Sequence, residues 1–257
     1  MPSAQTQRLR AQLEATLARK MPSALTPLAR VAYPVSPTGI GEIDRLLRGG
    51  LPVGAISEIV GPECSGRTSL ALALVANLTQ AGKVCAWVDV SDTLHPESAA
   101  AIGVDLSRLL WVRCCAARSK KSWSRLEQAL RVADLLLQAG GFCCIVLDMG
   151  SLQAEYALRV PLATWFRFRA AAERLQSNVL LLTQHACSRN SAGLVLRLEP
   201  GSVPGREATI FTGLAHQARL ERQRFPQSPG NVFAMRKQPQ SVPTAQWQSK
   251  TAWAGKR

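Results

Sequence analysis

The sequence contains no long apolar run. Its 257 residues hold nothing near the roughly 18 to 20 consecutive apolar residues that a membrane-spanning helix requires, and the longest runs are Leu70–Val75 and Cys143–Leu147. The beginning of the chain, Met1–Arg10, also lacks the apolar core of a signal peptide. We therefore expect a cytoplasmic protein that makes no contact with a membrane.

Metal-binding and disulfide patterns are missing as well. The cysteines are odd in number, seven in all, and they show no C-x-x-C spacing. Two of the three histidines, His185 and His216, have no second ligand at metal spacing. The pattern argues against a zinc site and against a disulfide framework, and it favours a reducing compartment.

Acidic residues are scarce. The chain has 17 Asp and Glu against 31 Lys and Arg, which gives a formal net charge of +14. The excess is concentrated in residues 1–37, with five bases and one acid, in residues 219–257, with eight and one, and in Arg108–Arg131, with seven and one. Clustered bases release condensed counterions when they bind a polyanion, which favours nucleic acid as a partner. A basic surface that serves only solubility is the alternative.

The composition divides the chain into three parts. Leu9, Leu13 and Leu17 recur at helical spacing within residues 5–20, and four prolines between residues 22 and 37 indicate a linker. We expect an N-terminal amphipathic helix and Pro-rich linker over residues 1–37, a nucleotide-binding core over 38–224 and a basic, disordered tail over 225–257. The indoles of Trp247 and Trp253 in this tail suggest a docking segment for a partner.

The core alternates short apolar runs with longer amphipathic ones. Runs typical of strands lie at 55–60, 84–90, 142–147 and 179–183, and runs typical of helices lie at 68–80, 122–138 and 155–176. Apolar strands joined by helices are typical of a parallel sheet that is covered on both faces. The predicted fold class is therefore α/β, with a mostly parallel sheet between helices and with edge strands at 194–198 and 217–222.

A phosphate-binding motif lies between the first strand and the first helix of this core. Residues 61–68 match the P-loop pattern G-x-x-x-x-G-K-[ST] at every fixed position except one, where Arg67 replaces lysine. The backbone N–H groups of such a loop bind phosphates, together with the positive end of the following helix dipole. The expected nucleotide-binding residues are Gly61, Pro62, Glu63, Cys64, Ser65, Gly66, Arg67, Thr68 and Ser69.

A second nucleotide-binding element is an apolar strand that ends in an acid. This strand, Phe142–Leu147, is followed by Asp148, which with the Thr68 hydroxyl would hold Mg²⁺ beside the phosphates of ATP. Arg67 is larger than lysine and planar, so this change puts hydrolysis in doubt more than phosphate binding.

These motifs and their surroundings resemble the ATP-binding core of the bacterial RecA recombinase family. The resemblance rests on the P-loop and on Pro37–Asp44, Gly49–Ile59, Gly82–Asp89 and Ala101–Leu106. It implies a RecA-like P-loop fold, ATP and Mg²⁺ as cofactors, association with the bacterial nucleoid, and an N-terminal helix through which copies of the chain form a homo-oligomer. We expect no counterpart to the large C-terminal domain of recombinases.

The resemblance also implies roles for single residues in hydrolysis. The recombinase glutamate that positions the attacking water corresponds to Ser91, whose hydroxyl cannot accept a proton at neutral pH. Asp92 is then the remaining, weak candidate for the base. Gln184 matches the glutamine that senses the γ-phosphate. Whether the protein is a weak DNA-dependent ATPase stays open at this point.

Other basic residues match places where recombinases contact DNA or a neighbouring subunit. Arg189 lies in residues 185–193, a short counterpart of a DNA-binding loop. Arg222 and Arg224 fall where recombinases have lysines that complete a neighbour's nucleotide site, with a solvated strand end as the alternative. From the basic stretch, the candidate DNA contacts are Arg118, Lys120 and Lys121.

Three functions fit this pattern. The short, basic chain is most similar to the ImuA group, RecA-related accessories of DNA repair in the SOS response. That similarity implies a role in translesion synthesis: ATP binding with little or no hydrolysis, sequence-independent binding of single-stranded DNA, and contacts with a Y-family-like polymerase accessory and an error-prone polymerase. The alternatives are an active ATP-dependent recombinase on single-stranded DNA and a RecA-derived cell-division inhibitor that acts through protein–protein contacts.

Overall fold

The computed structural model describes residue 9 and residues 34–114, 122–202, 213–224 and 242–250. By its contacts the chain divides into two units, residues 1–32 and 33–257. The expected N-terminal helix belongs to the first unit and lies outside the described residues, except for Leu9, which is helical and exposed. The second unit holds the α/β core.

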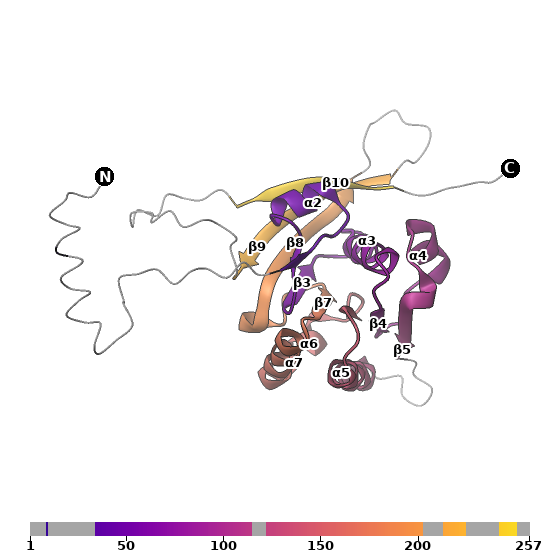
Figure 1. Ribbon diagram of the computed structural model, residues 1–257, viewed down its shortest axis with the longest axis vertical. Coiled ribbons are helices and arrows are strands. Elements are labelled where there is room, and N and C mark those ends of the chain that lie inside the picture. The colour runs from indigo at the N-terminus through magenta and orange to yellow at the C-terminus, as the bar shows by residue number, and fades with distance from the viewer. Residues whose placement is uncertain (1–8, 10–33, 115–121, 203–212, 225–241, 251–257) are drawn as a thin grey trace. The chain divides into compact units, whose positions relative to one another are not determined.

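An eight-stranded sheet forms the centre of this core, with helices on both faces (Figure 1). The strand order is β10-β9-β8-β3-β7-β6-β4-β5, in which β8 to β5 are parallel and β9 and β10 continue the sheet antiparallel. The strands of the sheet are β3 (Ile56–Val60), β4 (Cys85–Asp89), β5 (Leu109–Arg113), β6 (Cys144–Asp148), β7 (Asn178–Thr183), β8 (Ala192–Ser202), β9 (Gly213–Gln223) and β10 (Thr244–Lys250).

The helices and a small ribbon complete the unit. The helices are α2 (Gly41–Leu46), α3 (Arg67–Gln80), α4 (Pro96–Ile102), α5 (Ser122–Ala139), α6 (Ala154–Leu158) and α7 (Leu162–Leu175), with 3-10 turns at Leu106–Arg108 and Arg189–Ser191. The ribbon pairs β1 (Val35–Ser36) with β2 (Leu51–Pro52). None of the helices in the described part of the chain is both long and apolar enough to cross a membrane.

Two hydrophobic clusters hold the layers together. Successive strand side chains point to opposite faces, so Trp87 packs on the face covered by α2, α3 and α4, whereas Val88 packs on the face covered by α5, α6 and α7 (Figure 1). The strands β3, β4 and β6 are buried at every position. This arrangement confirms the predicted α/β class with a mostly parallel sheet between helices.

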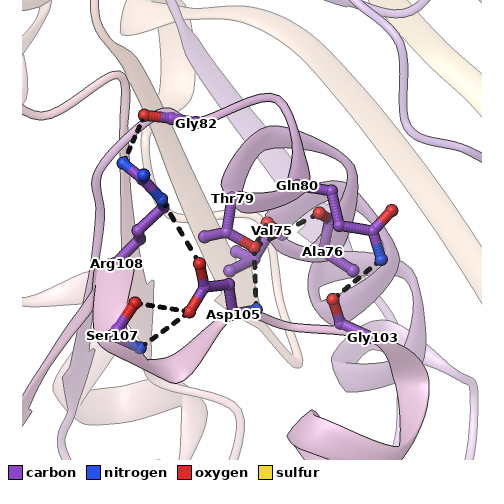
Figure 2. Close-up of polar contacts among 9 residues, drawn as sticks. All are labelled: Val75, Ala76, Thr79, Gln80, Gly82, Gly103, Asp105, Ser107 and Arg108. Atoms are coloured by element: carbon purple, nitrogen blue, oxygen red, sulfur yellow. Dashed lines mark hydrogen bonds and ion pairs between the residues drawn. The ribbon is translucent and has the colours of Figure 1, made fainter.

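The carboxyl end of α3 is fastened to the segment that leads into the edge strand β5. The Thr79 hydroxyl accepts a hydrogen bond from the Asp105 N–H at 3.1 Å, and the Gln80 amide donates to the Gly103 carbonyl at 2.9 Å (Figure 2). Arg108 forms an ion pair with Asp105 at 3.3 Å. These contacts fix α4 and β5 relative to the helix that begins at the P-loop.

The structure differs from the expected elements in several places: α2, α4 and β5 were not expected, and β8 and β9, expected at the edge, are inner strands. The single helix expected over 155–176 is divided into α6 and α7, because Pro161 has no N–H to donate and restricts Val160 before it. In addition, β1 lies inside the stretch expected to be a linker and pairs with β2.

The expected disordered tail contains a strand. Residues Thr244–Lys250 form β10, which pairs along its full length with β9, so β9 is an inner strand and β10 is the edge. Trp247 is buried rather than exposed to a partner. The sequence around β10 has the composition of a disordered tail, and the strand that β10 pairs with, β9, lies about 30 residues earlier in the chain. The strand was therefore not predicted.

Candidate nucleotide-binding site

The predicted site residues meet at the carboxyl edge of the parallel strands. The P-loop follows β3, and the register places Val60 beside Thr183 of β7, and Asp148 of β6 beside Asp89 of β4. The loop begins at Gly61, whose N–H donates to the Thr183 carbonyl at 3.1 Å. Strand pairing therefore brings the ends of β3, β4, β6 and β7 together, although they are far apart in the sequence.

Two glycines determine the backbone shape of the P-loop. Gly66 caps α3 in the left-handed conformation, with φ of 88°, and as glycine it offers no side-chain cap to the first N–H groups of the helix. A β-carbon at Gly61 would lie 2.5 Å from the Ser65 hydroxyl and 2.7 Å from the Leu198 carbonyl, so only glycine fits there. Thr68 is exposed at the start of α3, and the loop residues Pro62, Glu63 and Cys64 are exposed as well.

Two aromatic side chains from the antiparallel strands lie close to the P-loop at Gly66. His216 of β9 and Trp247 of β10 stack with ring centroids 4.6 Å apart, and a β-carbon at Gly66 would lie 2.9 Å from each ring. Burial lowers the pKa of His216, while a hydrogen bond with the Ser65 backbone acts in the opposite direction. The strand from the expected tail is thus part of the P-loop's surroundings.

Arg67 extends from the P-loop to the end of β6. Its side chain is 9% exposed, and its Nη2 donates to the Gly150 carbonyl at 3.1 Å. Gln184, the predicted γ-phosphate sensor, donates to the same carbonyl through Nε2 at 3.0 Å. Burial lowers the pKa of Arg67, while the charges of Asp148 and Glu63 act to raise it. Arg67 and Gln184 are therefore joined through one backbone oxygen.

Asp148 lies beside the Arg67 guanidinium. Its Oδ1 accepts a hydrogen bond from the Gly150 N–H at 3.0 Å, and a β-carbon at position 150 would lie 3.1 Å from both this oxygen and Arg67 Nη1. Burial raises the pKa of Asp148 to about 6, and the nearby Asp89 adds to the rise, whereas the Gly150 N–H and Arg67 oppose it.

The predicted Mg²⁺ ligands do not fit a hydrated cation as they stand. Asp148 is 6% exposed, and the group beside it is a guanidinium, which carries positive charge and has no lone pair to offer a metal. Mg²⁺ keeps several waters and demands oxygen ligands around it. Among the described residues, no group of three or more His, Cys, Asp and Glu side chains is placed to hold a metal ion.

The two carboxylates at and after the end of β4, Asp89 and Asp92, are both held by hydrogen bonds. Asp89 is fully buried and accepts hydrogen bonds from the Ser91 N–H at 3.2 Å and the Leu94 N–H at 2.8 Å. Asp92, the candidate base, binds Arg113 through both oxygens at 2.6 Å, and this bidentate pair lowers the pKa of Asp92. A carboxylate held in this way is a poor proton acceptor.

The predicted interface residues lie at the other end of the sheet. Leu194 pairs with Gln223, near the start of β8, whereas Val60, next to the P-loop, pairs with Arg197 farther along. The Arg222 guanidinium donates to the Arg189 carbonyl, and the Arg224 N–H donates to the Gly193 carbonyl at 2.8 Å. These arginines are therefore away from their own chain's P-loop. The other candidate DNA contacts, Arg118, Lys120 and Lys121, lie outside the described residues.

The buried carboxylate of Glu58, at the centre of β3, is not among the predicted site residues. Its Oε1 accepts from the Cys187 N–H at 2.7 Å, and its Oε2 accepts from the Ser188 hydroxyl at 2.5 Å. It is fully buried, so it anchors the loop between Gln184 and Arg189 to the central strand. The one available sign was a charged residue inside an apolar strand, Ile56–Val60.

Comparison with known proteins agrees with this architecture. The model of the RecA N-terminal domain matches residues 23–158. The RecA protein of Acidothermus cellulolyticus is 42% identical over 121 residues, and that of Nocardia farcinica is 40% identical over 139 residues. These alignments cover 47% and 54% of this chain but 32% and 38% of the relatives, so the chain matches about a third of their length.

A solved structure extends the likeness in fold beyond that region. The crystal structure of the RadB recombinase has a TM-score of 0.55 and 22% identity, and the match covers 74% of this chain and 91% of that chain. At this identity the likeness concerns the fold alone. Because the match to the RecA N-terminal domain extends over more than half of its residues, this chain belongs to the RecA family.

Proposed function

We propose that this protein is a RecA-like DNA-repair accessory of damage-induced translesion synthesis, which binds ATP with little or no hydrolysis and engages single-stranded DNA and polymerase partners. Proteins of its family bind ATP and DNA and act in recombination and repair. The ImuA-like role, with a Y-family-like polymerase accessory and an error-prone polymerase as partners, is the finer part of the proposal. It draws on the short, basic chain and its altered nucleotide site.

One observation carries the proposal: the P-loop keeps its phosphate-binding shape while the groups that would drive hydrolysis are replaced or engaged. Gly61 and Gly66 shape the loop, and the start of α3 has no side-chain cap. Arg67, however, is bonded to the end of β6, Ser91 stands where a catalytic glutamate is expected, and Asp92 is bound to Arg113. Such a site favours nucleotide binding over turnover.

The proposed DNA contacts are electrostatic. Arg189 is exposed on the short loop that follows Gln184, and Arg222 lies against it. Because Cys187, Ser188 and Ser191 of that loop are buried, it presents few side chains for DNA, and most of the affinity should come from the basic segments outside it. Binding should then be independent of sequence and weaken steeply with salt.

Nucleotide binding and turnover, measured on the same preparation, test the proposal. We expect saturable binding of a fluorescent ATP analogue, with phosphate release that stays at the level of the Thr68→Ala variant with or without single-stranded DNA. DNA-stimulated release well above that variant would support the recombinase alternative instead. No binding at millimolar nucleotide would contradict the proposal and favour an interaction protein such as the division inhibitor.

The contribution of the tail needs substitutions rather than truncation. Cutting the chain after Arg224 would remove β10 and the Trp247 ring behind the P-loop, so it would disturb the nucleotide site as well as the charge. The paired change Arg236→Gln and Lys237→Gln removes charge outside the described strands, and Arg45→Gln is a control on exposed α2. We expect the tail variant to lower the salt slope of single-stranded DNA binding by about 2. An unchanged slope would contradict a role for the tail in DNA binding.

A further inference from the structure

A β-carbon added to Gly150 would contact both the Arg67 guanidinium and the carboxylate of Asp148, the predicted Mg²⁺ ligand. The side chain is more than nine-tenths buried, and Nη2 is fixed by the Gly150 carbonyl at 3.1 Å. Nη1 is buried without a hydrogen-bond partner among the described residues, and both Nη1 and Asp148 Oδ1 lie 3.1 Å from the position that a β-carbon on Gly150 would take. The guanidinium is thus a positive charge built into the site, not a mobile surface arginine.

The second group on the Gly150 carbonyl links this charge to the sensor position. Gln184 Nε2 donates to the same oxygen at 3.0 Å, and the Gly150 N–H donates to Asp148 Oδ1 at 3.0 Å. Arg67, Asp148 and Gln184 therefore form one network around a single backbone unit. A divalent cation at Asp148 would have to displace or repel the guanidinium at its centre.

We propose that Arg67 takes the place of Mg²⁺ in this site, so that the protein binds nucleoside polyphosphates without a divalent cation. The inference rests on the proposed nucleotide binding at the P-loop. Its physical reason is that a permanently charged guanidinium supplies the positive charge and hydrogen-bond donors that a phosphate needs, whereas it cannot serve as a metal ligand. The Thr68 hydroxyl, a Mg²⁺ ligand in such loops, then has no cation to hold.

The test compares affinities for a fluorescent ATP analogue in MgCl₂ and in EDTA, with the full chain. We expect the dissociation constant of the wild type to differ by less than about twofold between the two buffers, because its cation position is filled. The Arg67→Lys variant restores a compact ammonium and opens the space beside Asp148. It should bind at least roughly tenfold tighter with Mg²⁺ than without.

Thr68→Ala gives a second measurement that does not depend on replacing Arg67. In the wild-type background it should leave the ratio of the dissociation constants in MgCl₂ and in EDTA unchanged within about twofold, whatever it does to the affinity itself, and in the Arg67→Lys background it should remove most of the gain from Mg²⁺. Arg45→Lys, the same chemical change at an exposed arginine of α2, is the matched control. Circular dichroism checks that each variant is folded.

The outcomes separate this inference from the function on which it rests. A wild-type affinity that tightens roughly tenfold or more with Mg²⁺ would overturn the role of Arg67 and leave nucleotide binding intact. No saturable binding in either buffer would overturn the proposed nucleotide binding, and this inference with it.

A second inference rests on two thiols at the amino ends of the strands, away from the P-loop. Cys85, in β4, and Cys143, just before β6, place their Sγ atoms 3.6 Å apart. Cys85 is buried and Cys143 is half-buried, so a small reagent can reach the second thiol. The hydrogen bond with Cys85 and the charge of Lys83 lower the pKa of Cys143, whereas the same bond and burial raise the pKa of Cys85, so Cys143 is the first of the two to react.

We infer that Cys85 and Cys143 form a disulfide when they meet a low-molecular-weight disulfide. The Cys143 thiolate attacks one sulfur of that compound, which forms a mixed disulfide and releases one thiolate. The Cys85 sulfur then attacks Cys143 Sγ, the bond from Cys143 to the small compound breaks, and the Cys85 proton passes to the second thiolate as it leaves. Two protein thiols are oxidised, and the small disulfide is reduced to two thiols.

Incubation with oxidised glutathione, followed by peptide mapping, tests this inference. We expect a peptide pair linked through Cys85 and Cys143, and the loss of two thiols that react with a chromogenic disulfide after denaturation. Cys143→Ser should abolish the linked pair, whereas Cys64→Ser, which removes an exposed thiol of the P-loop, should leave it unchanged. A glutathione adduct that persists on Cys143, or an unchanged thiol count, would overturn the inference.

Discussion

Replacing Glu58 by glutamine tests whether the loop after β7 is held by a buried carboxylate. In the wild type, Oε1 accepts from the Cys187 N–H at 2.7 Å, and Oε2 accepts from the Ser188 hydroxyl at 2.5 Å and the Ser188 N–H at 3.4 Å. Glutamine keeps one acceptor but turns the other into a donor that faces the Ser188 N–H. The side chain is fully buried, so water cannot replace the lost bonds.

The magnitude follows from the bonds that are lost. Hydrogen bonds to a charged group contribute about 1.5 to 3 kcal/mol, and the weak Ser188 N–H bond adds little, so Glu58→Gln should lower the free energy of unfolding by about 2 kcal/mol. For a domain of this size the melting temperature should fall by roughly 4 to 8 °C. Ser188→Ala removes only the donor and should cost about 1 kcal/mol.

Urea denaturation followed by circular dichroism gives the free energies, and hydrogen exchange of the peptide that covers residues 184–191 locates the change. We expect faster exchange in this loop in Glu58→Gln, with the exchange of α3 unchanged under native conditions. In a double-mutant cycle, Glu58→Gln and Ser188→Ala should be less than additive, because they remove the same bond. A Glu58→Gln variant within about 0.5 kcal/mol of the wild type would refute the reasoning.

Three further predictions concern the surroundings of the P-loop. Trp247→Ala should lower the free energy of unfolding by about 3 kcal/mol and weaken nucleotide binding. The control Val242→Ala, at an exposed position just before β10, should change the free energy of unfolding by less than about 0.5 kcal/mol. Urea denaturation and nucleotide titration measure both variants. Because burial lowers the pKa of His216, its stability contribution should be fully present above about pH 6.5 and decline as the pH falls toward the folded value, and His216→Asn should flatten that part of the stability profile. Arg113→Gln should raise the pKa of Asp92 toward its ordinary value in a carboxyl titration followed by NMR; an unchanged pKa would show that the ion pair does not hold it down.

The parts of the site that depend on local backbone could be predicted from the sequence. The P-loop is a continuous segment whose glycines and following helix determine its shape, so its position between β3 and α3 follows from the pattern. Asp148 was found because an apolar strand ends there, and parallel strands end at a common edge. The fold class followed from the alternation of strand and helix patterns for the same reason.

The remaining features depend on contacts between distant segments. The P-loop pattern shows that Arg67 is in the motif, but the direction of its side chain is decided by Gly150, 83 residues later in the chain. The role of Glu58 depends on donors about 130 residues away. These partners carry no sequence signal of their own, because they are a glycine carbonyl, two backbone N–H groups and the hydroxyl of one serine in a polar loop. Such contacts can be identified only once the arrangement of the strands in space is known.

The strand β10 changes how the positive charge of the chain relates to its function. By composition residues 225–257 are a basic tail with five bases and no acid, which predicts a disordered segment that contributes to DNA binding. In the structure the same region contributes an edge strand of the sheet, and its Trp247 ring packs with His216 against the glycine that begins α3. The P-loop and β10 are therefore in contact, and a partner that separates β10 from β9 should also remove the Trp247 ring from Gly66. If DNA or a polymerase partner binds the basic residues that flank β10, their binding should be coupled to nucleotide affinity through this one glycine, and Trp247→Ala should break the coupling while leaving the charge intact.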